Sequence, residues 1–265
     1  MTQDKKIHIL ESTWDGLGDH LRLSTLPELY AKAGYDVYLH KRAEFKNEQI
    51  EELIVDHNPY ILGITDERLD KSIYPEGHHG IEYLPVQHSN YISNIEMFHG
   101  FEPTNTKPKI YYDAEFLPDH EDIVLVDMGS VSAEWKSPHD SQELIEKVQK
   151  LQETKFKGKK LVQVLIETPV LKPNKKIPYV HPHVLDDKIL VEDIFHYCDL
   201  MRSCYGIIAL DSGATHLASA MHRQNPDLRS VCLMERNRYH DFVSRSLLIN
   251  ENTDYILLDK CYNKT

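Results

Sequence analysis

The sequence predicts an α/β fold with two parallel sheets, and three observations support this prediction. Short apolar segments alternate with segments of helical periodicity along the 265 residues, as they do in parallel-sheet proteins. The composition, with 41% hydrophobic and 27% charged residues, is that of a globular protein. Three prolines, Pro103, Pro108 and Pro118, lie close together in the middle of the chain and mark a candidate boundary between domains. We therefore expect two domains, residues 1–118 and residues 119–265.

The first half is expected to begin with a strand, a glycine-containing turn and a helix. Ser24 or Thr25 is the expected helix cap, because Pro27 suits a first helical turn, and Gly34 is the expected end. The irregular stretch 66–90 is typical of a binding loop or lid. Strands and helices of this half are expected at Lys6–Ser12, Tyr35–His40, Gln49–Val55, Tyr60–Thr65 and Tyr91–His99.

The second half repeats the alternation of strands and helices. Its strands are expected at Asp122–Met128, Lys160–Ile166, Tyr205–Leu210, Arg229–Met234 and Tyr255–Leu258. Its helices are expected at Ser141–Glu153, Val191–Ser203 and Ala214–His222. The stretch 172–187, which is rich in proline and histidine, is expected to be a loop.

Charge and hydropathy exclude several classes of protein. The formal net charge of -12 argues against a general coating of DNA or RNA, because non-specific binding is mainly electrostatic. No apolar stretch approaches the ~20 residues of a membrane-spanning helix, and the polar N-terminus lacks the apolar region of a signal peptide. A cytoplasmic location is therefore expected. The four cysteines form no C-x-x-C pair, so we expect free thiols rather than a disulfide framework.

The first loop with suggestive chemistry is Gly16-Leu17-Gly18-Asp19, which follows the first strand. Parallel sheets place their ligand sites at the carboxyl ends of the strands. Glycines let the backbone approach a ligand closely, and Asp19 offers a carboxylate there. The alternative is a tight turn in which Asp19 caps the next helix. The loop is not a G-x-G-x-x-G dinucleotide fingerprint, since Leu21 stands at the last position.

The second loop is Asp211–His216, with the sequence DSGATH, where a strand turns into a helix. The amides of Ser212–Ala214 are expected to be unpaired at the positive end of the helix, which is the kind of anion site that phosphates use. Thr215 offers a hydroxyl, and the histidine either reaches a phosphate or packs inside. The alternative is a capped helix start without a ligand.

In this order, across two α/β halves, the two loops resemble those of glycosyltransferase family 9, the lipopolysaccharide heptosyltransferase-like enzymes. Tyr91–Lys109 is similar to the family's helix and Gly-x-x-Pro run, Asp127–Trp135 to its glycine-serine turn, and Val191–Arg223 to its D-S-G-x-x-H-L-A segment. The resemblance implies the GT-B fold, in which two Rossmann-like domains face a central cleft. Because the chain is short for two such domains, a compact or trimmed version is expected.

The resemblance also implies an inverting, metal-independent transfer of a sugar from a nucleotide-diphosphate sugar to an acceptor hydroxyl. Asp19 matches the family's catalytic aspartate, the general base that takes the proton of the acceptor hydroxyl. Ser212, Gly213, Ala214 and Thr215 would stabilise the leaving diphosphate with amides and a hydroxyl. The donor is expected in the C-terminal half and the acceptor in the N-terminal half. No cofactor or metal is expected, and the chain has no D-x-D signature.

Further contacts are expected on each side of this site. Lys136 stands in for the lysine that the family carries before its tryptophan, where this chain has Ala133 and Glu134. The gap from Asp19 to Pro27 is longer than is usual in the family. The other donor-side candidates are Ser130, Glu167, Asp211 and His216. The acceptor-side candidates are Gly16, Gly18, His20, Arg22, His78 and His79.

Several alternatives stay open at this point. The expected acceptor is a saccharide, such as one in lipopolysaccharide. A hydroxylated DNA base, as in some bacteriophages, is an alternative that the acidic net charge counts against and that the lysines of stretch 172–176 keep open. A non-catalytic nucleotide-sugar-binding module would have the same fold. A dehydrogenase ranks last, because the glycine fingerprint is absent. His181 and His183 have a metal-like spacing but no accompanying ligands, so no metal site is expected there. The oligomeric state is left open.

Overall fold

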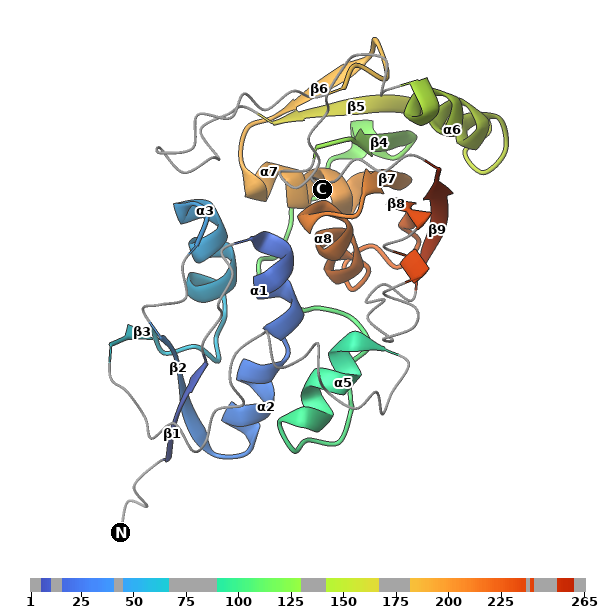
Figure 1. The fold of residues 1–265 in the computed structure, drawn as a ribbon. Coiled ribbons are helices and arrows are strands. Elements are labelled where there is room, and N and C mark those ends of the chain that lie inside the picture. The colour runs from blue at the N-terminus through green and yellow to red at the C-terminus, as the bar shows by residue number, and fades with distance from the viewer. Residues whose placement is uncertain are drawn as a thin grey trace. The chain divides into compact units, whose positions relative to one another are not determined.

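The computed structural model describes residues 6–10, 16–40, 45–66, 90–129, 142–166, 182–236, 239–240 and 252–259 (Figure 1). These residues form two compact units, one ending at Tyr112 and the other beginning at Asp113. Each unit has its own parallel sheet with helices, so the predicted α/β class is confirmed. The domain division at residues 118/119 stays a prediction. Among the described helices, none has the length and apolar character needed to cross a membrane.

The first unit contains a three-stranded parallel sheet in the order β1-β2-β3. The strands are β1 (Lys6–Leu10), β2 (Tyr35–His40) and β3 (Ile64–Thr65). The helices are α1 (Leu17–Leu23), α2 (Leu26–Lys32), α3 (Glu48–Glu51), which continues as a π-helical turn over Glu52–Asp56, and α5 (Tyr91–Phe98). β3 is shorter than the predicted strand Tyr60–Thr65, since Gly63 has a φ of 149° and leaves the regular strand conformation.

The segment after β1 differs from the predicted turn and single helix. α1 begins directly after Gly16, whose carbonyl accepts a hydrogen bond from the N–H of Asp19 at 3.0 Å. Gly18 and Asp19 therefore lie in the first turn of a helix rather than in a turn before it. A break at Ser24–Thr25 separates α1 from α2, and Pro27 lies in the first turn of α2 as expected. This break accommodates the long gap between Asp19 and Pro27.

A contact distant in sequence holds the break between α1 and α2. Ser24 Oγ donates to the carbonyl of Leu21 at 2.7 Å and accepts from the N–H of Lys109 at 2.7 Å. A serine that binds a carbonyl of the preceding turn competes with the next helical hydrogen bond. Because Lys109 lies 85 residues further along the chain, local periodicity could not reveal this break.

The second unit contains a six-stranded sheet in the order β6-β5-β4-β7-β8-β9, and every pair is parallel. The strands are β4 (Ile123–Asp127), β5 (Lys160–Ile166), β6 (Lys188–Val191), β7 (Gly206–Leu210), β8 (Arg229–Glu235) and β9 (Thr253–Leu258). The helices are a 3-10 turn over Pro118–His120, α6 (Gln142–Glu153), α7 (Ile194–Ser203) and α8 (Gly213–Met221).

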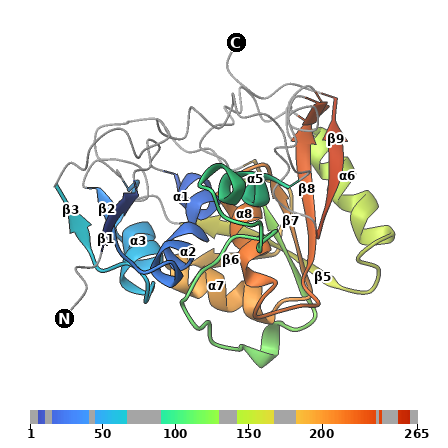
Figure 2. The same ribbon diagram turned by 90° about the horizontal axis from the view of Figure 1, so that it is seen from below.

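Helices cover both faces of this second sheet. α6 lies on one face, and α7 and α8 lie on the other (Figure 2). Val124 and Val126 of β4 pack in the same buried cluster as Leu144 and Val148 of α6. Every residue of β4 and β7 is buried, which is typical of the central strands of a parallel sheet. These two strands form the centre of the core.

β6 is a strand that the sequence analysis missed, since the helix was expected to begin at Val191. Asp193 caps α7 instead, and its side chain accepts a hydrogen bond from the N–H of His196 at 2.7 Å. The helix therefore begins at Ile194, which leaves Lys188–Val191 free to pair with β5. A four-residue, partly exposed edge strand has too little apolar periodicity to be recognised locally.

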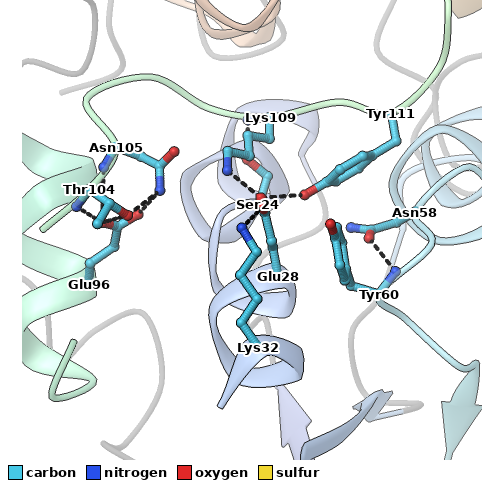
Figure 3. A network of polar contacts seen from close by, with 10 residues as sticks. All are labelled: Ser24, Glu28, Lys32, Asn58, Tyr60, Glu96, Thr104, Asn105, Lys109 and Tyr111. Carbon is cyan, nitrogen blue, oxygen red and sulfur yellow. Dashed lines mark hydrogen bonds and ion pairs between the residues drawn. The ribbon is translucent and has the colours of Figure 1, made fainter. Parts of the chain in front are cut away.

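Two carboxylates hold the segment 104–111 against the helices of the first unit (Figure 3). Glu28 of α2 accepts hydrogen bonds from Lys109 Nζ, from Lys32 Nζ at 2.5 Å and from the Tyr111 hydroxyl at 3.1 Å. Glu96 of α5 is fully buried and accepts from the N–H of Thr104 at 2.7 Å. The irregular segment that ends the unit is thus attached at several points along its length.

Three cysteines of the described residues are buried: Cys198, Cys204 and Cys232. Burial raises the pKa of the Cys204 thiol to about 12, so this group stays protonated at neutral pH. Cys261 lies outside the described residues.

Glu28→Gln is expected to destabilise the protein at pH 7 by about 1–3 kcal/mol, because Lys109 loses its charged partner while it stays buried. Burial raises the pKa of Glu28, but the bonds from Lys109, Lys32 and Tyr111 outweigh it and lower the pKa from 4.5 to about 2. A carboxylate with a lowered pKa stabilises the fold above its ordinary pKa, and this contribution is lost as the pH falls toward 2. Urea denaturation at pH 7, 5 and 3 should therefore show a difference between wild type and variant that shrinks with falling pH.

Glu52→Gln is the matched control for this experiment, because Glu52 is exposed in the same unit. It should change the free energy of unfolding by less than about 0.5 kcal/mol at any of these pH values. A destabilisation by Glu28→Gln that does not depend on pH would contradict the ion-pair explanation.

Candidate functional site

The second sheet has a topological switch point between β4 and β7. These neighbouring strands are parallel, with Asp127 of β4 opposite Ala209 of β7. From β4 the chain continues to β5 and β6 on one side, and from β7 to β8 and β9 on the other. The segments after the two strands, at Gly129 and at Asp211–Gly213, therefore leave the same edge of the sheet and diverge. In open α/β sheets, ligands bind at such a point.

The helix start after β7 is capped, and this limits which of the predicted donors can bind an anion. Ser212 is the N-cap of α8, and its Oγ accepts from the N–H of Ala214 at 3.3 Å. The Thr215 hydroxyl is buried and donates to the carbonyl of Leu210 at 2.7 Å. The N–H groups of Ser212 and Gly213, by contrast, have no partner within the described part of the chain. Those two amides are the available donors at the positive end of this helix.

Two further predicted residues, Asp211 and His216, lie next to this helix start in the sequence. Asp211 follows the last residue of β7 and is half-buried. His216 lies in the first turn of α8 with only 7% of its surface exposed. Most of its imidazole surface is therefore covered by other parts of the protein.

Asp127, at the end of β4, is a polar residue of the switch point that the sequence analysis did not single out. Only 2% of its surface is exposed. Its Oδ1 accepts from the N–H of Gly129 at 2.7 Å, and its Oδ2 accepts from the hydroxyl of Tyr197 in α7 at 2.7 Å. Burial raises the pKa of Asp127, and these two hydrogen bonds oppose the shift. The available signal was an acidic residue that ends an otherwise apolar strand, IVLVD.

Asp19 lies in the first turn of α1, in the first unit, beside a glycine and an arginine. A Cβ atom at Gly16 would lie 2.8 Å from Asp19 Oδ2, so the carboxylate occupies space that only glycine leaves open. Asp19 Oδ1 lies 3.6 Å from an Arg22 guanidinium nitrogen. The guanidinium carbon of Arg22 lies 5.2 Å from the centre of the Tyr91 ring. Asp19, the predicted base, thus lies together with two of the predicted acceptor-side residues, Gly16 and Arg22.

His20 does not lie with Gly16, Asp19 and Arg22. It is 4% exposed, and its ring stacks on Phe45 with the ring centres 4.2 Å apart. Gly18 lies in the first turn of α1, between Gly16 and Asp19 in the sequence. The candidates Ser130, Lys136, Glu167, His78 and His79 lie outside the described residues, as do His181 and the lysines of stretch 172–176.

No group of three or more histidine, cysteine, aspartate or glutamate side chains is arranged to hold a metal ion in the part of the chain that the structure describes. His183, one of the two histidines with metal-like spacing, lies 3.2 Å from Asp186 on an exposed surface.

The fold is similar to that of several solved glycosyltransferases. The iron-containing dodecameric glycosyltransferase TibC from enterotoxigenic E. coli H10407 covers 98% of this chain, with a TM-score of 0.60 and 14% identity. A family 9 glycosyl transferase from Veillonella parvula DSM 2008 covers 97% of this chain and 86% of its own, with a TM-score of 0.53 and 12% identity. The E. coli heptosyltransferase WaaC, solved with ADP, covers 94% of this chain and 92% of its own, with a TM-score of 0.54 and 11% identity.

These likenesses confirm the fold that the sequence resemblance implied, that of the heptosyltransferase-like glycosyltransferases. This chain spans 66% of the length of the TibC chain. No protein-family model and no curated protein sequence matches it. A central cleft between two domains stays a prediction.

Ser212→Ala is expected to reduce the free energy of unfolding by about 0.5–1 kcal/mol, because it removes the acceptor that caps α8. Asp193→Ala, which removes the cap of α7, is the matched variant and should cost about 1–2 kcal/mol. The reason is that Asp193 is a charged acceptor at 2.7 Å, whereas the Ser212 cap is neutral and spans 3.3 Å. Thermal and urea unfolding would measure both, and a larger loss from Ser212→Ala would contradict this ranking.

Proposed function

We propose that this chain is an inverting, metal-independent glycosyltransferase that moves a sugar from a nucleotide-diphosphate sugar to an acceptor hydroxyl. The observation that carries the proposal is the pair of amides at Ser212 and Gly213, at the switch point between β4 and β7. This anion-binding geometry occurs in a chain that shares its fold with solved glycosyltransferases. The structural neighbours thereby support an enzyme that transfers sugars.

The donor diphosphate is assigned to the start of α8. The two amides and the positive end of a nine-residue helix favour a phosphate group there. As the bond from the anomeric carbon to the diphosphate breaks, negative charge develops on the leaving oxygen, and oriented N–H groups stabilise it without rearranging. Ser130, Lys136, Glu167, Asp211 and His216 are the further donor-side residues of the proposal. WaaC was solved with ADP and TibC with ADP-D-beta-D-heptose, so adenine nucleotides are the first donors to test.

Asp19 is assigned the role of general base. Its carboxylate would take the proton of the acceptor hydroxyl while that oxygen attacks the anomeric carbon on the side opposite the diphosphate. A single displacement of this kind inverts the anomeric centre. The carboxylate is 29% exposed, which leaves it accessible to an acceptor, and Arg22 restricts its orientation from one side. Gly16, Gly18, His78 and His79 are the other acceptor-side residues of the proposal, and His20, which is buried against Phe45, is not among them.

The proposed acceptor is a saccharide, and the proposed location is the cytoplasm. The net charge of -12 favours a saccharide over a hydroxylated DNA base. Binding of duplex DNA that weakens steeply with added salt would favour the DNA base instead.

A non-catalytic nucleotide-sugar-binding module is the second candidate, because Ala133 and Glu134 stand where the family carries a phosphate-binding lysine.

Nucleoside diphosphates are expected to raise the melting temperature of the protein, because a ligand that binds only the folded state stabilises it. A panel of ADP, UDP, GDP, CMP and their sugar conjugates, each with and without EDTA, would identify the base. At about 100 times Kd, the expected stabilisation is roughly 2.7 kcal/mol. A shift that EDTA does not change supports metal-independent binding. No shift with any compound would leave the Ser212–Gly213 amides as a plain helix start and contradict the proposal.

Asp19→Asn is expected to lower the rate of sugar transfer by roughly 100- to 10,000-fold, because an amide cannot take the acceptor proton. Donor binding in the thermal-shift assay should stay unchanged. Gly16→Ala should reduce transfer less severely, since a Cβ at this position displaces the Asp19 carboxylate without removing it. Asp56→Asn, an exposed carboxylate of the same unit, is the control. Full transfer by Asp19→Asn would remove Asp19 from the base role, and donor binding without any turnover by wild type would favour the non-catalytic module.

A further inference from the structure

The end of β4 carries a buried acid that the proposed chemistry does not use. The other four residues of the strand, Ile123–Val126, are apolar, and Asp127 is 2% exposed. Removing a carboxylate from water costs free energy unless donors compensate it. Within the described residues no cation pairs with it. Among the described residues, its compensation comes from hydrogen bonds.

The two oxygens of Asp127 have one donor each, and the donors come from different elements. Oδ1 accepts from the N–H of Gly129, two residues further along the chain, at 2.7 Å. Oδ2 accepts from the hydroxyl of Tyr197, which is 5% exposed in α7, at 2.7 Å. A side chain that binds the amide two residues on turns the chain out of its strand direction. The tyrosine holds the carboxylate in the orientation that this turn requires.

This turn occurs at the switch point. Asp127 is opposite Ala209 of β7, so the chain leaves β4 beside the strand that ends at Leu210 and leads into Ser212. α7, which carries Tyr197, also packs against α8, whose first residues supply the two available amides. One hydrogen-bonded pair thus connects the end of β4 to the helix layer that contains the proposed diphosphate site.

We propose that Asp127 is a positioning residue for the donor, and that with Tyr197 it fixes Gly129 as the β4 side of the diphosphate site formed by Ser212 and Gly213. The inference rests on the proposed function, because it assigns the site a nucleoside diphosphate. Asp127 itself does not touch the donor. It acts through the backbone at Gly129.

The pair can be dissected with variants that separate hydrogen bonding from charge. Asp127→Asn keeps both contacts, since its Oδ1 can accept from Gly129 and its Nδ2 can donate to the Tyr197 oxygen. Asp127→Ala removes both contacts, and Tyr197→Phe removes only the second. Ser230→Ala is the matched control, because it removes a buried hydrogen bond of 3.4 Å to His222 near the amino end of β8.

The experiment measures the Kd of ADP, UDP and GDP by calorimetry and the melting temperature of each variant without ligand. For the diphosphate that wild type binds, Asp127→Ala is expected to raise Kd by roughly 10- to 100-fold and Tyr197→Phe by roughly 3- to 10-fold. Asp127→Asn should stay within about threefold of wild type, and Ser230→Ala should lower the melting temperature without changing Kd. In transfer assays, the KM of the donor should rise while the KM of the acceptor stays unchanged.

The outcomes separate this inference from the proposed function. If wild type binds a diphosphate and Tyr197→Phe and Asp127→Ala bind it equally well, the pair is structural and the inference is overturned, while the proposed function stands. If Asp127→Ala does not fold, the Kd of Tyr197→Phe is compared with that of Asp127→Asn, and equal Kd values for the two variants overturn the inference. If Asp127→Asn loses diphosphate binding as Asp127→Ala does, binding depends on the charge of Asp127 rather than on its hydrogen bonds, and the inference is overturned. If wild type binds none of the three diphosphates, the proposed function fails and the inference fails with it.

Discussion

The parallel pairing of β4 with β7 is the constraint on which the candidate donor site depends. Both strands are buried along their whole length, so their backbone groups must find hydrogen-bond partners in neighbouring strands. Parallel pairing then brings both carboxyl ends to the same edge of the sheet. Gly129 and Ser212, which are distant in sequence, consequently follow adjacent strands, and the chain turns to opposite sides beyond them. Topology alone therefore makes this edge of the sheet the candidate location of a ligand site.

Three carboxylates, of which Glu96 and Asp127 are buried and Glu28 is half-buried, hold irregular segments in place, and each has different hydrogen-bond partners. Glu28 is bound by two lysines and a tyrosine, Glu96 by the amides of Thr104 and Asn105, and Asp127 by one amide and one hydroxyl. The hydrogen bonds and ion pairs of Glu28 outweigh its burial and lower its pKa to about 2. At Asp127, burial outweighs the two hydrogen bonds and raises the pKa. Glu28 therefore stabilises its unit through ion pairs, whereas Asp127 holds the turn at Gly129 through two hydrogen bonds.

The fold is shared with glycosyltransferases that are only 11–14% identical to this chain. A parallel α/β architecture requires apolar strands and helices that cover both faces, and very different sequences meet that requirement. A reaction requires particular atoms at particular places, which the proposed function assigns to the carboxylate of Asp19 and the amides of Ser212 and Gly213. Fold and function therefore rest on separate observations, and the function has to be argued from the site.

The sequence by itself determined the apolar strands, the switch from strand to helix at Ser212 and the α/β class, because these signals lie within a few neighbouring residues. Only the tertiary structure decided the features that need a distant partner. Lys109 binds Ser24 at the helix break, pairing with β5 makes a strand of the short segment Lys188–Val191, and Tyr197 orients Asp127. The physical reason is that periodicity records which face of an element is buried, whereas a hydrogen bond between distant residues exists only once the chain has folded.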